Sequence, residues 1–198
     1  ALAIRDTTLY VGGYFWTANS ATRYCLIAVG AETGWLHSWD PVLERIPVST
    51  RDGGPHVGAL LVRGDLLFVG GSFTKLGGQG RRGLAQLYLS NGLATAWNPK
   101  PSRQSTFGPD FWALALSGDT LFVAGTYDSL GGGGGQAGGT AAALSATTAE
   151  RLGWDPRTND FVFALALQHG VMFVGGWFTS IGEDWVLRRG LAAIDART

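Results

Sequence analysis

Residue types that commonly carry catalysis or hold metal ions are few in this chain and lie far apart. The three histidines, His37, His56 and His169, show no spacing typical of metal ligands. The single cysteine, Cys25, can form neither an intramolecular disulfide nor a cysteine cluster. A Gly-x-Ser-x-Gly nucleophile motif does not occur in the sequence. The sequence therefore predicts no catalytic residues, no metal site and no cofactor, and we expect a protein that is not an enzyme.

Candidate binding residues lie instead in the long segments between the predicted strands, where charged and aromatic side chains gather. Long loops carried on one face of a rigid scaffold are where binding sites usually lie. We therefore expect a binding surface that combines residues of several segments: Trp16, Arg51, Asp52, Arg81, Arg82, Lys100, Arg103, Asp110, Arg157, Asp160, Trp185 and Arg188. A second interpretation stays open, because charged residues are exposed by default and the same set can form a solvated rim without a defined site.

Composition narrows the classes of partner. Of the 198 residues, 45% are apolar and only 15% are charged, and the 15 basic and 15 acidic side chains balance to a net charge of zero. This neutrality argues against binding to nucleic acid or to a membrane surface through bulk electrostatics. The sequence also lacks an apolar stretch of about 18 residues, so no membrane insertion is expected.

Two sequence anchors recur in step along the chain and reveal an internal repeat. The first is an apolar pair followed by Gly-Gly, with Ala-Gly in the third copy, and it ends at Gly13, Gly71, Gly125 and Gly176. The second is a Trp followed by Asp or Asn and then Pro, and it begins at Trp39, Trp97 and Trp154. The Trp follows the last Gly by 26, 26 and 29 residues, so the two anchors belong to one repeating unit.

Each unit contains two further apolar segments that are typical of β-strands. One precedes the Gly-Gly anchor and alternates Ala with larger apolar residues, as in Ala113–Leu116 and Ala164–Leu167. Another lies between the two anchors, as in Leu26–Val29 and Leu84–Leu87. Together with the two anchor segments, they predict four strands for each unit. The predicted units span residues 1–41, 56–99, 111–156 and 162–198, and the last one lacks its Trp-bearing strand.

The anchor residues have structural explanations. Glycines at the end of a strand let backbones approach where side chains would collide, a role that we assign to Gly12, Gly13, Gly70, Gly71, Gly125, Gly175 and Gly176. Large indoles can fill the gap between neighbouring sheets, as we expect for Trp39, Trp97 and Trp154. A short polar side chain before Pro can accept backbone hydrogen bonds in the turn, as we expect for Asp40, Asn98 and Asp155.

A spacing of about 50 residues for four strands is typical of a β-propeller blade. The apolar pair with Gly-Gly and a distant Trp resembles kelch-type blades. The fuller pattern is similar to the delta-60 propeller repeats of bacterial secreted proteins and to the fungal cortical polarity-marker propellers; it combines Leu67 to Thr74, Gly77-Gly78 and Trp97-Asn98-Pro99. This resemblance covers essentially the whole chain. It implies a propeller fold, on which adhesion, scaffold and enzyme functions all occur.

The predicted fold class is therefore all-β, as a β-propeller built of four-stranded antiparallel blades, with about 3.75 blades in this chain. An open arc of blades exposes sheet faces that invite association. We therefore expect either a segment of a larger ring, of roughly 6–8 blades, or a part that another chain completes. The expected partners are other protein chains, further blades of the same protein, or a second copy in a homo-oligomer.

These features favour a non-enzymatic structural or interaction module that mediates protein–protein assembly or surface recognition, at an extracellular or cell-surface location. Two alternatives stay open. One is a propeller that binds carbohydrate or another ligand through rim aromatics such as Trp16 and Trp185. The other is part of a propeller enzyme whose catalytic residues lie outside this segment.

Overall fold

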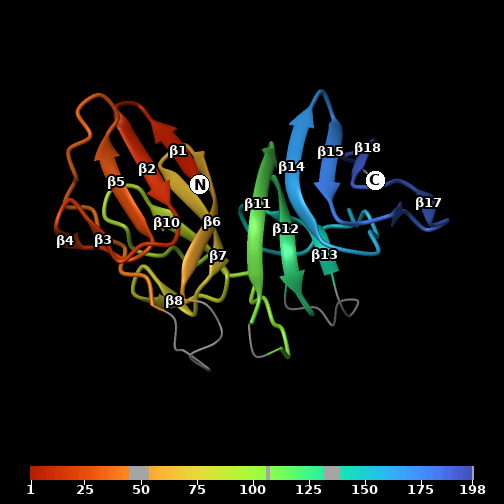
Figure 1. Ribbon diagram of the computed structural model, residues 1–198, viewed down its shortest axis with the longest axis horizontal. Coiled ribbons are helices and arrows are strands. Elements are labelled where there is room, and N and C mark those ends of the chain that lie inside the picture. The colour runs from red at the N-terminus through yellow and green to blue at the C-terminus, as the bar shows by residue number, and fades with distance from the viewer. Residues whose placement is uncertain (45–53, 106–107, 132–138, 198) are drawn as a thin grey trace.

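Four antiparallel sheets of three strands each follow one another in chain order (Figure 1). The computed structural model describes residues 1–44, 54–105, 108–131 and 139–197, and this part of the chain contains strands and no helix. It accordingly contains no helix that could cross a membrane.

Sheets 1 and 2 form the N-terminal half. Sheet 1 contains β1 (Leu2–Arg5), β2 (Thr8–Gly12) and β5 (Leu26–Gly30). Sheet 2 contains β6 (His56–Arg63), β7 (Leu66–Ser72) and β10 (Leu84–Tyr88).

Sheets 3 and 4 form the C-terminal half. Sheet 3 contains β11 (Asp110–Ser117), β12 (Thr120–Tyr127) and β13 (Gly139–Ser145). Sheet 4 contains β14 (Val162–Gln168), β15 (Val171–Gly176) and β18 (Leu191–Asp195). The strands coincide with three of the four predicted segments in sheets 1 to 3 and with all three predicted segments in sheet 4, so these strand predictions are confirmed.

Three short hairpins that the sequence did not predict lie between the middle and last strands of sheets 1, 2 and 4. They pair β3 (Thr17–Ala18) with β4 (Ala21–Thr22), β8 (Lys75–Leu76) with β9 (Gln79–Gly80), and β16 (Ser180–Ile181) with β17 (Val186–Leu187). Part of each long connection is therefore ordered by its own ladder.

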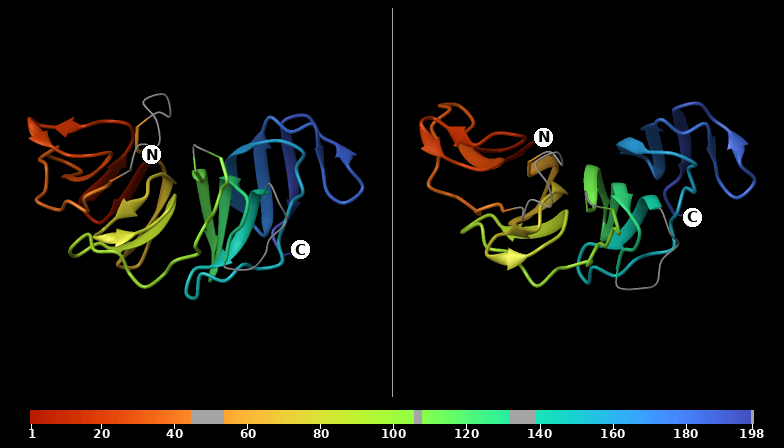
Figure 2. Two further views of the ribbon diagram at one scale, coloured as in Figure 1. Left: turned by 90° about the horizontal axis from the view of Figure 1, so that it is seen from below. Right: turned by 60° about the horizontal axis from the view of Figure 1, so that its bottom comes forward.

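The sheets form a curved row, with sheets 1 and 4 at its two ends (Figure 2). The first strands β1, β6, β11 and β14 lie on the concave side, and each contacts the first strand of the next sheet. No backbone ladder joins one sheet to the next in the described residues. The sheets are therefore held together by side-chain packing and by single hydrogen bonds, such as that from the amide of Val57 to the carbonyl of Gly13.

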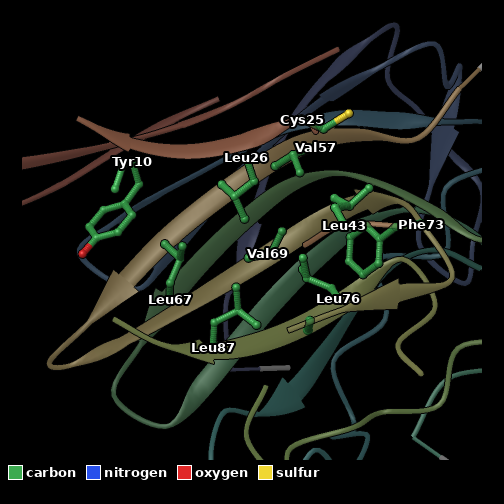
Figure 3. Close-up of a cluster of buried hydrophobic side chains, with 12 residues drawn as sticks. Tyr10, Cys25, Leu26, Leu43, Val57, Leu67, Val69, Phe73, Leu76 and Leu87 are labelled. Carbon is green, nitrogen blue, oxygen red and sulfur yellow. The ribbon is translucent and has the colours of Figure 1, made fainter. Parts of the chain in front are cut away.

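Each sheet has two apolar faces, because successive residues of a strand point to opposite sides. We call the side toward the next sheet the forward face and the side toward the preceding sheet the rear face. Between sheets 1 and 2, Tyr10, Leu26 and Ala28 of one forward face pack against a rear face that contains Val57, Leu67 and Val69 (Figure 3). Two further clusters fill the junctions between sheets 2 and 3 and between sheets 3 and 4.

The two kinds of face differ in composition. At the centre of three forward faces, an aromatic residue of the middle strand lies between two alanines: Ala3–Tyr10–Ala28, Ala115–Phe122–Ala143 and Ala166–Phe173–Ala193. In sheet 2, Phe68 lies between Leu61 and Gln86. The rear faces instead carry aliphatic rows such as Leu60–Val69–Ala85 and Leu165–Val174–Ala192. At the junctions of sheets 1 with 2 and 3 with 4, bulky aliphatic rows therefore meet a forward face that has one aromatic ring between two alanines.

The predicted fourth strand is wrong for this structure. The Trp-bearing segments of the first three units make only single bridges to the last strand, at Val29–Leu36, Leu87–Ala94 and Leu144–Arg151. They leave the sheet edge because the indole turns back over the forward face of its own sheet. The proline that follows has no amide hydrogen with which to extend a ladder.

Each indole instead meets the forward-face aromatic of its own sheet edge-on. Ring centroids are 5.2 Å apart for Trp39 with Tyr10, 5.3 Å for Trp97 with Phe68 and 4.9 Å for Trp154 with Phe122. Two of the indoles also reach the next sheet: Trp97 Nε1 donates to the carbonyl of Ser145, and Trp154 Nε1 donates to that of Asp195, each at 3.0 Å. The prediction that the tryptophans fill the gaps between sheets is confirmed.

The polar residues after the tryptophans also act as predicted. Oδ1 of Asp40, Asn98 and Asp155 accepts a hydrogen bond from the backbone amide two residues on, at 3.3, 3.0 and 3.0 Å. The residues whose amides donate are Val42, Lys100 and Arg157. Each has a positive φ, which is unusual for a residue other than glycine. The side-chain bond therefore stabilises a tight turn that redirects the chain toward the next sheet.

The second glycine of the Gly-Gly anchor is sterically required in sheets 2, 3 and 4, whereas in sheet 1 the first one is, because a methyl group on Gly12 would overlap Cγ1 of Val57. A methyl group on Gly71, Gly125 or Gly176 would overlap a carbonyl oxygen at or just before the start of the facing first strand. The first position already holds Ala124 in sheet 3 without conflict. Gly13 is an exception among the second glycines, because the nearest atom to an added methyl is a Phe15 side-chain carbon at 3.5 Å.

We predict that Gly125→Ala destabilises the chain and that Gly13→Ala does not. The methyl at position 125 meets backbone that cannot rotate away, so we expect a loss of about 1–3 kcal/mol in the free energy of unfolding. The matched Gly13→Ala change should stay within about 0.5 kcal/mol of the parent chain. Urea unfolding of both variants measures this, and equal losses at the two positions would contradict the assignment.

Candidate functional site

A β-bulge recurs near the start of three first strands. The registers of β6, β11 and β14 against their middle strands skip one residue, which is Gly58, Trp112 and Phe163 respectively. A bulge turns the extra side chain out of the regular alternation, and bulges are common beside functional sites. The extra residue in sheets 3 and 4 is aromatic, and these two rings come together on neighbouring sheets.

These bulge residues belong to a cluster of four aromatic rings. Ring centroids are 4.9 Å apart for Trp112 and Phe163, 5.0 Å for Phe163 and Trp177, and 5.7 Å for Phe161 and Trp112. Trp177 is 68% exposed. Because the rings touch one another, no space for a ligand remains between them, and a ligand would have to lie on the outer surface of the cluster.

A polar chain adjoins the aromatic cluster and connects sheets 2 and 3. His56 Nε2 lies 3.1 Å from Asp110 Oδ1, and Trp112 Nε1 donates to Asp110 Oδ2 at 3.1 Å. The carboxylate therefore holds the indole of Trp112 in place and lies near the imidazole of the preceding sheet. The described residues contain no group of three or more His, Cys, Asp or Glu side chains that could hold a metal ion.

The predicted site residues do not form one site. Trp16 lies between β2 and β3, in the connection between the middle and last strands of sheet 1, and packs with Tyr14 and Tyr24 at centroid distances of 4.9 and 6.3 Å. Trp185 precedes β17 in the loop of sheet 4, at the opposite end of the row (Figure 1). These two aromatics therefore cannot bind one small ligand together.

Arg81 is not a rim residue, which corrects the sequence-based assignment. It is buried, and its guanidinium donates to the backbone carbonyls of Thr95, at 2.6 Å, and Gly80, at 2.9 Å. Burial lowers the pKa of this guanidinium, because the charged form loses hydration. Arg81 therefore ties the hairpin of sheet 2 to the Trp97 segment and is unavailable to a ligand.

Several of the other predicted residues serve their own loops. Arg103 donates to the hydroxyl of Thr126 at 2.9 Å, and Asp160 accepts the amide of Phe161 at 2.7 Å. Arg157 forms an exposed ion pair with Glu183, at 2.9 Å. Arg82, Lys100 and Arg188 are exposed, in agreement with a solvated rim. Arg51 and Asp52 lie outside the described residues. Of the predicted set, Asp110 and Asp160 adjoin the aromatic cluster, Asp110 through Nε1 of Trp112 and Asp160 through the amide of Phe161.

Cys25 has a structural role. It is fully buried, and its Sγ donates to the carbonyl of Pro55 at 2.9 Å, across the junction with sheet 2. Burial raises the pKa of this thiol. The reactive thiolate is therefore disfavoured, as expected for a buried cysteine that packs as a small apolar residue.

Sheets 1 and 4, at the two ends of the row, each expose an apolar face of the kind that is buried between neighbouring sheets. On the forward face of sheet 4, Phe173 is 39% exposed and Leu191 is 65% exposed. On the rear face of sheet 1, Leu2 is 65% exposed and Ile4 is 59% exposed. Single exposed apolar residues are common on proteins, but contiguous apolar faces mark surfaces that bind. These end faces are the largest departure from an ordinary polar surface.

Sequence reasoning overlooked the aromatic cluster. The signal was present, because Phe111-Trp112 and Phe161-Val162-Phe163 interrupt the small/large alternation at the same place in two units. The predicted first strands begin only at Ala113 and Ala164, and sequence pattern alone does not show the bulge that brings these aromatic side chains together.

Comparisons with known proteins give a likeness in fold and no family. No family model and no curated protein matches the chain. Among solved structures, the chain is similar to the computationally designed Ika4 protein, with a TM-score of 0.54 and 16% identity over 98% of this chain and 88% of that one. It also matches the computationally designed Ika8 protein, with a TM-score of 0.48 and 15% identity over all of this chain and 58% of that one. The first likeness shows the fold alone.

Proposed function

We propose that the chain is a non-enzymatic interaction module, a segment of a β-propeller that works by assembling with other protein chains through its end sheets. The proposal includes an extracellular or cell-surface location, which the resemblance to propellers of secreted proteins suggests. Four repeated sheets in a curved row, with their first strands on the concave side, support the propeller assignment.

One observation carries the proposal: the same aromatic face is covered in sheet 3 and uncovered in sheet 4. Phe122, between Ala115 and Ala143, is 1% exposed because sheet 4 and Trp154 cover it. Phe173 lies between Ala166 and Ala193 in the same register, and it is 39% exposed. Covering the 39% of Phe173 that is exposed contributes roughly 1 kcal/mol, and its apolar neighbours on the same face add to this, so the exposed face favours association.

We predict that the chain associates in solution and that Phe173→Asp abolishes this association. Light scattering after size exclusion should give the parent chain a mass above 20.9 kDa and the variant a mass of 20.9 kDa. A charge at position 173 stays hydrated only if the face remains uncovered. Leu93→Asp is the matched control, because Leu93 is 54% exposed and lies on a turn away from both end faces.

Two outcomes contradict the proposed function. One is a parent chain that has the monomer mass at every concentration at which it stays soluble. The other is a Phe173→Asp variant that associates as strongly as the Leu93→Asp control.

A second candidate function, carbohydrate binding, is favoured by the cluster of Trp112, Phe161, Phe163 and Trp177. Exposed indole faces stack on the apolar face of a sugar ring, and a nearby carboxylate such as Asp110 can accept sugar hydroxyls. For this candidate we propose the cluster on sheets 3 and 4 as the site, in place of the Trp16 and Trp185 suggested by the sequence. Since the four rings fill the space between themselves, the ligand would be a sugar stacked on the outside and not one enclosed in a cage.

Affinity electrophoresis tests this candidate: it measures how strongly a soluble β-glucan or starch in the gel retards the protein. Trp177→Ala should weaken the retardation constant roughly two- to tenfold, which corresponds to about 0.5–1.5 kcal/mol for one stacked ring. Trp35→Ala is the control, since Trp35 is also exposed (72%) but lies in a turn of sheet 1. Equal retardation of both variants and the parent protein would exclude the cluster as a site for these sugars.

A further inference from the structure

We infer that the partner of the end faces is a second copy of this chain, docked head to tail. The forward face of sheet 4 in each copy covers the rear face of sheet 1 in the other, and two chains close into one ring of eight sheets. This inference rests on the proposed function and adds the identity of the partner, the polarity of the contact and its stoichiometry.

The polarity follows from the three junctions inside the chain. At each of them a forward face meets a rear face, and no junction pairs two faces of one kind. At the junction of sheets 3 and 4, for example, Phe122 and its flanking alanines belong to one cluster with Met172 and Val174 of the next rear face. The chain thus contains three examples of the contact that its own ends can make.

The rear face of sheet 1 carries the set of residues that such a contact requires. Its ladder aligns Leu2, Val11 and Ile27 in one row and Ile4, Leu9 and Val29 in the next. The corresponding rows of sheet 2 are Leu60–Val69–Ala85 and Val62–Leu67–Leu87, and these pack against sheet 1. All six positions are aliphatic in both sheets, so the exposed rear face of sheet 1 matches the buried one of sheet 2.

Contacts between two faces of one kind would pack poorly. If two rear faces met, bulky rows of Leu, Ile and Val would collide with rows of the same kind. If two forward faces met, the alanines around each aromatic ring would face other alanines and leave voids. Protein interiors tolerate neither overlap nor voids, because overlapping atoms repel one another and voids lose dispersion contacts. Head-to-tail docking places bulky rows against small residues, as at the interior junctions.

Two of the three interior junctions have an ion pair at the rim with the same polarity. The end of a first strand pairs with the acid in the first turn of the next sheet, as Arg63 does with Asp119 at 3.0 Å and Arg5 with Asp65 at 3.5 Å. In a head-to-tail contact, Gln168 at the end of β14 faces the turn of sheet 1 in the second copy. That turn contains Asp6, whose carboxylate can accept from the Gln168 amide.

Closure into two chains follows from the curvature of the row. A contact between two different faces gives either a closed ring or an open fibre, depending on whether its rotation closes. The sheets bend in one direction, and sheets 1 and 4 form the two arms of a U in the right-hand view of Figure 2. A second copy that repeats this bend at both ends completes the ring.

Complementation between two matched variants tests this inference. Leu2 and Leu191 are each 65% exposed, one on the rear face of sheet 1 and the other on the forward face of sheet 4. Leu2→Asp and Leu191→Asp each leave one end face intact. Alone, each variant should have the monomer mass of 20.9 kDa, because every contact needs both kinds of face. Mixed in equal amounts, they should form a one-to-one heterodimer through the two intact faces.

The outcomes separate this inference from the proposed function. A parent chain of twice 20.9 kDa, with variants that associate only when mixed, agrees with both. A variant that dimerises alone overturns the head-to-tail polarity, and so does a mixture that stays monomeric while the parent chain associates. A parent mass that grows with concentration beyond two chains overturns the closed ring. A parent chain that is always monomeric contradicts the proposed function as well.

Circular dichroism of both variants checks that each is folded. A second pair, Ile4→Asp and Phe173→Asp, repeats the measurement at other positions of the same two faces. The mixture of Leu2→Asp with Ile4→Asp is the negative control, because both variants lack the same rear face and should remain monomeric.

Discussion

The edge-on contact between an indole and the aromatic residue at the centre of its own sheet is the interaction on which this fold depends. It buries two large side chains at once, and its geometry places the positive ring edge of one against the negative ring face of the other. In sheets 2 and 3 the indole also donates a hydrogen bond to the last strand of the following sheet. One side chain thus covers a face, fills a junction and fixes the position of the neighbouring sheet.

A sheet of three short strands cannot shield two apolar faces by itself, so each sheet depends on its neighbours. This dependence explains why the chain has three apolar clusters between sheets and no single central core. It also explains why the ends of the row carry interior-type faces. The proposed assembly extends to the two end sheets the same coverage that the interior sheets already have.

The sequence predicted the parts of the structure that repeat. The second anchor glycine recurs in sheets 2, 3 and 4 because each meets an equivalent backbone oxygen, and the polar residues before Pro recur because each of these turns uses the same hydrogen bond. The fourth strand was wrong, because an extended apolar segment with a Trp has the pattern of a strand even when its indole folds over the sheet. Ladder pairing depends on the neighbouring backbone, which sequence pattern does not contain.

Functional residues were harder to predict because they depend on contacts between units. Arg81 has the sequence context of an exposed loop, and only the folded hairpin brings its guanidinium to the carbonyl of Thr95. Trp112 and Phe163 lie 51 residues apart in the chain, and their rings meet only because the same bulge occurs on two adjacent sheets. A single sequence shows the residues of such a cluster but not the register shift that aims them at one another.

Hydrogen exchange in sheet 4 is the most direct measurement of whether these sheets depend on covered faces. The comparison is between the parent chain and Leu2→Asp, which leaves the sequence of sheet 4 unchanged but removes the face that we propose covers it. In the parent chain, the amides of β15 and β18 should exchange as slowly as those of β12 and β13. In the variant they should exchange markedly faster while β12 and β13 keep their protection, since local opening rises where apolar contacts are lost. Equal protection of β15 and β18 in both proteins would contradict the account.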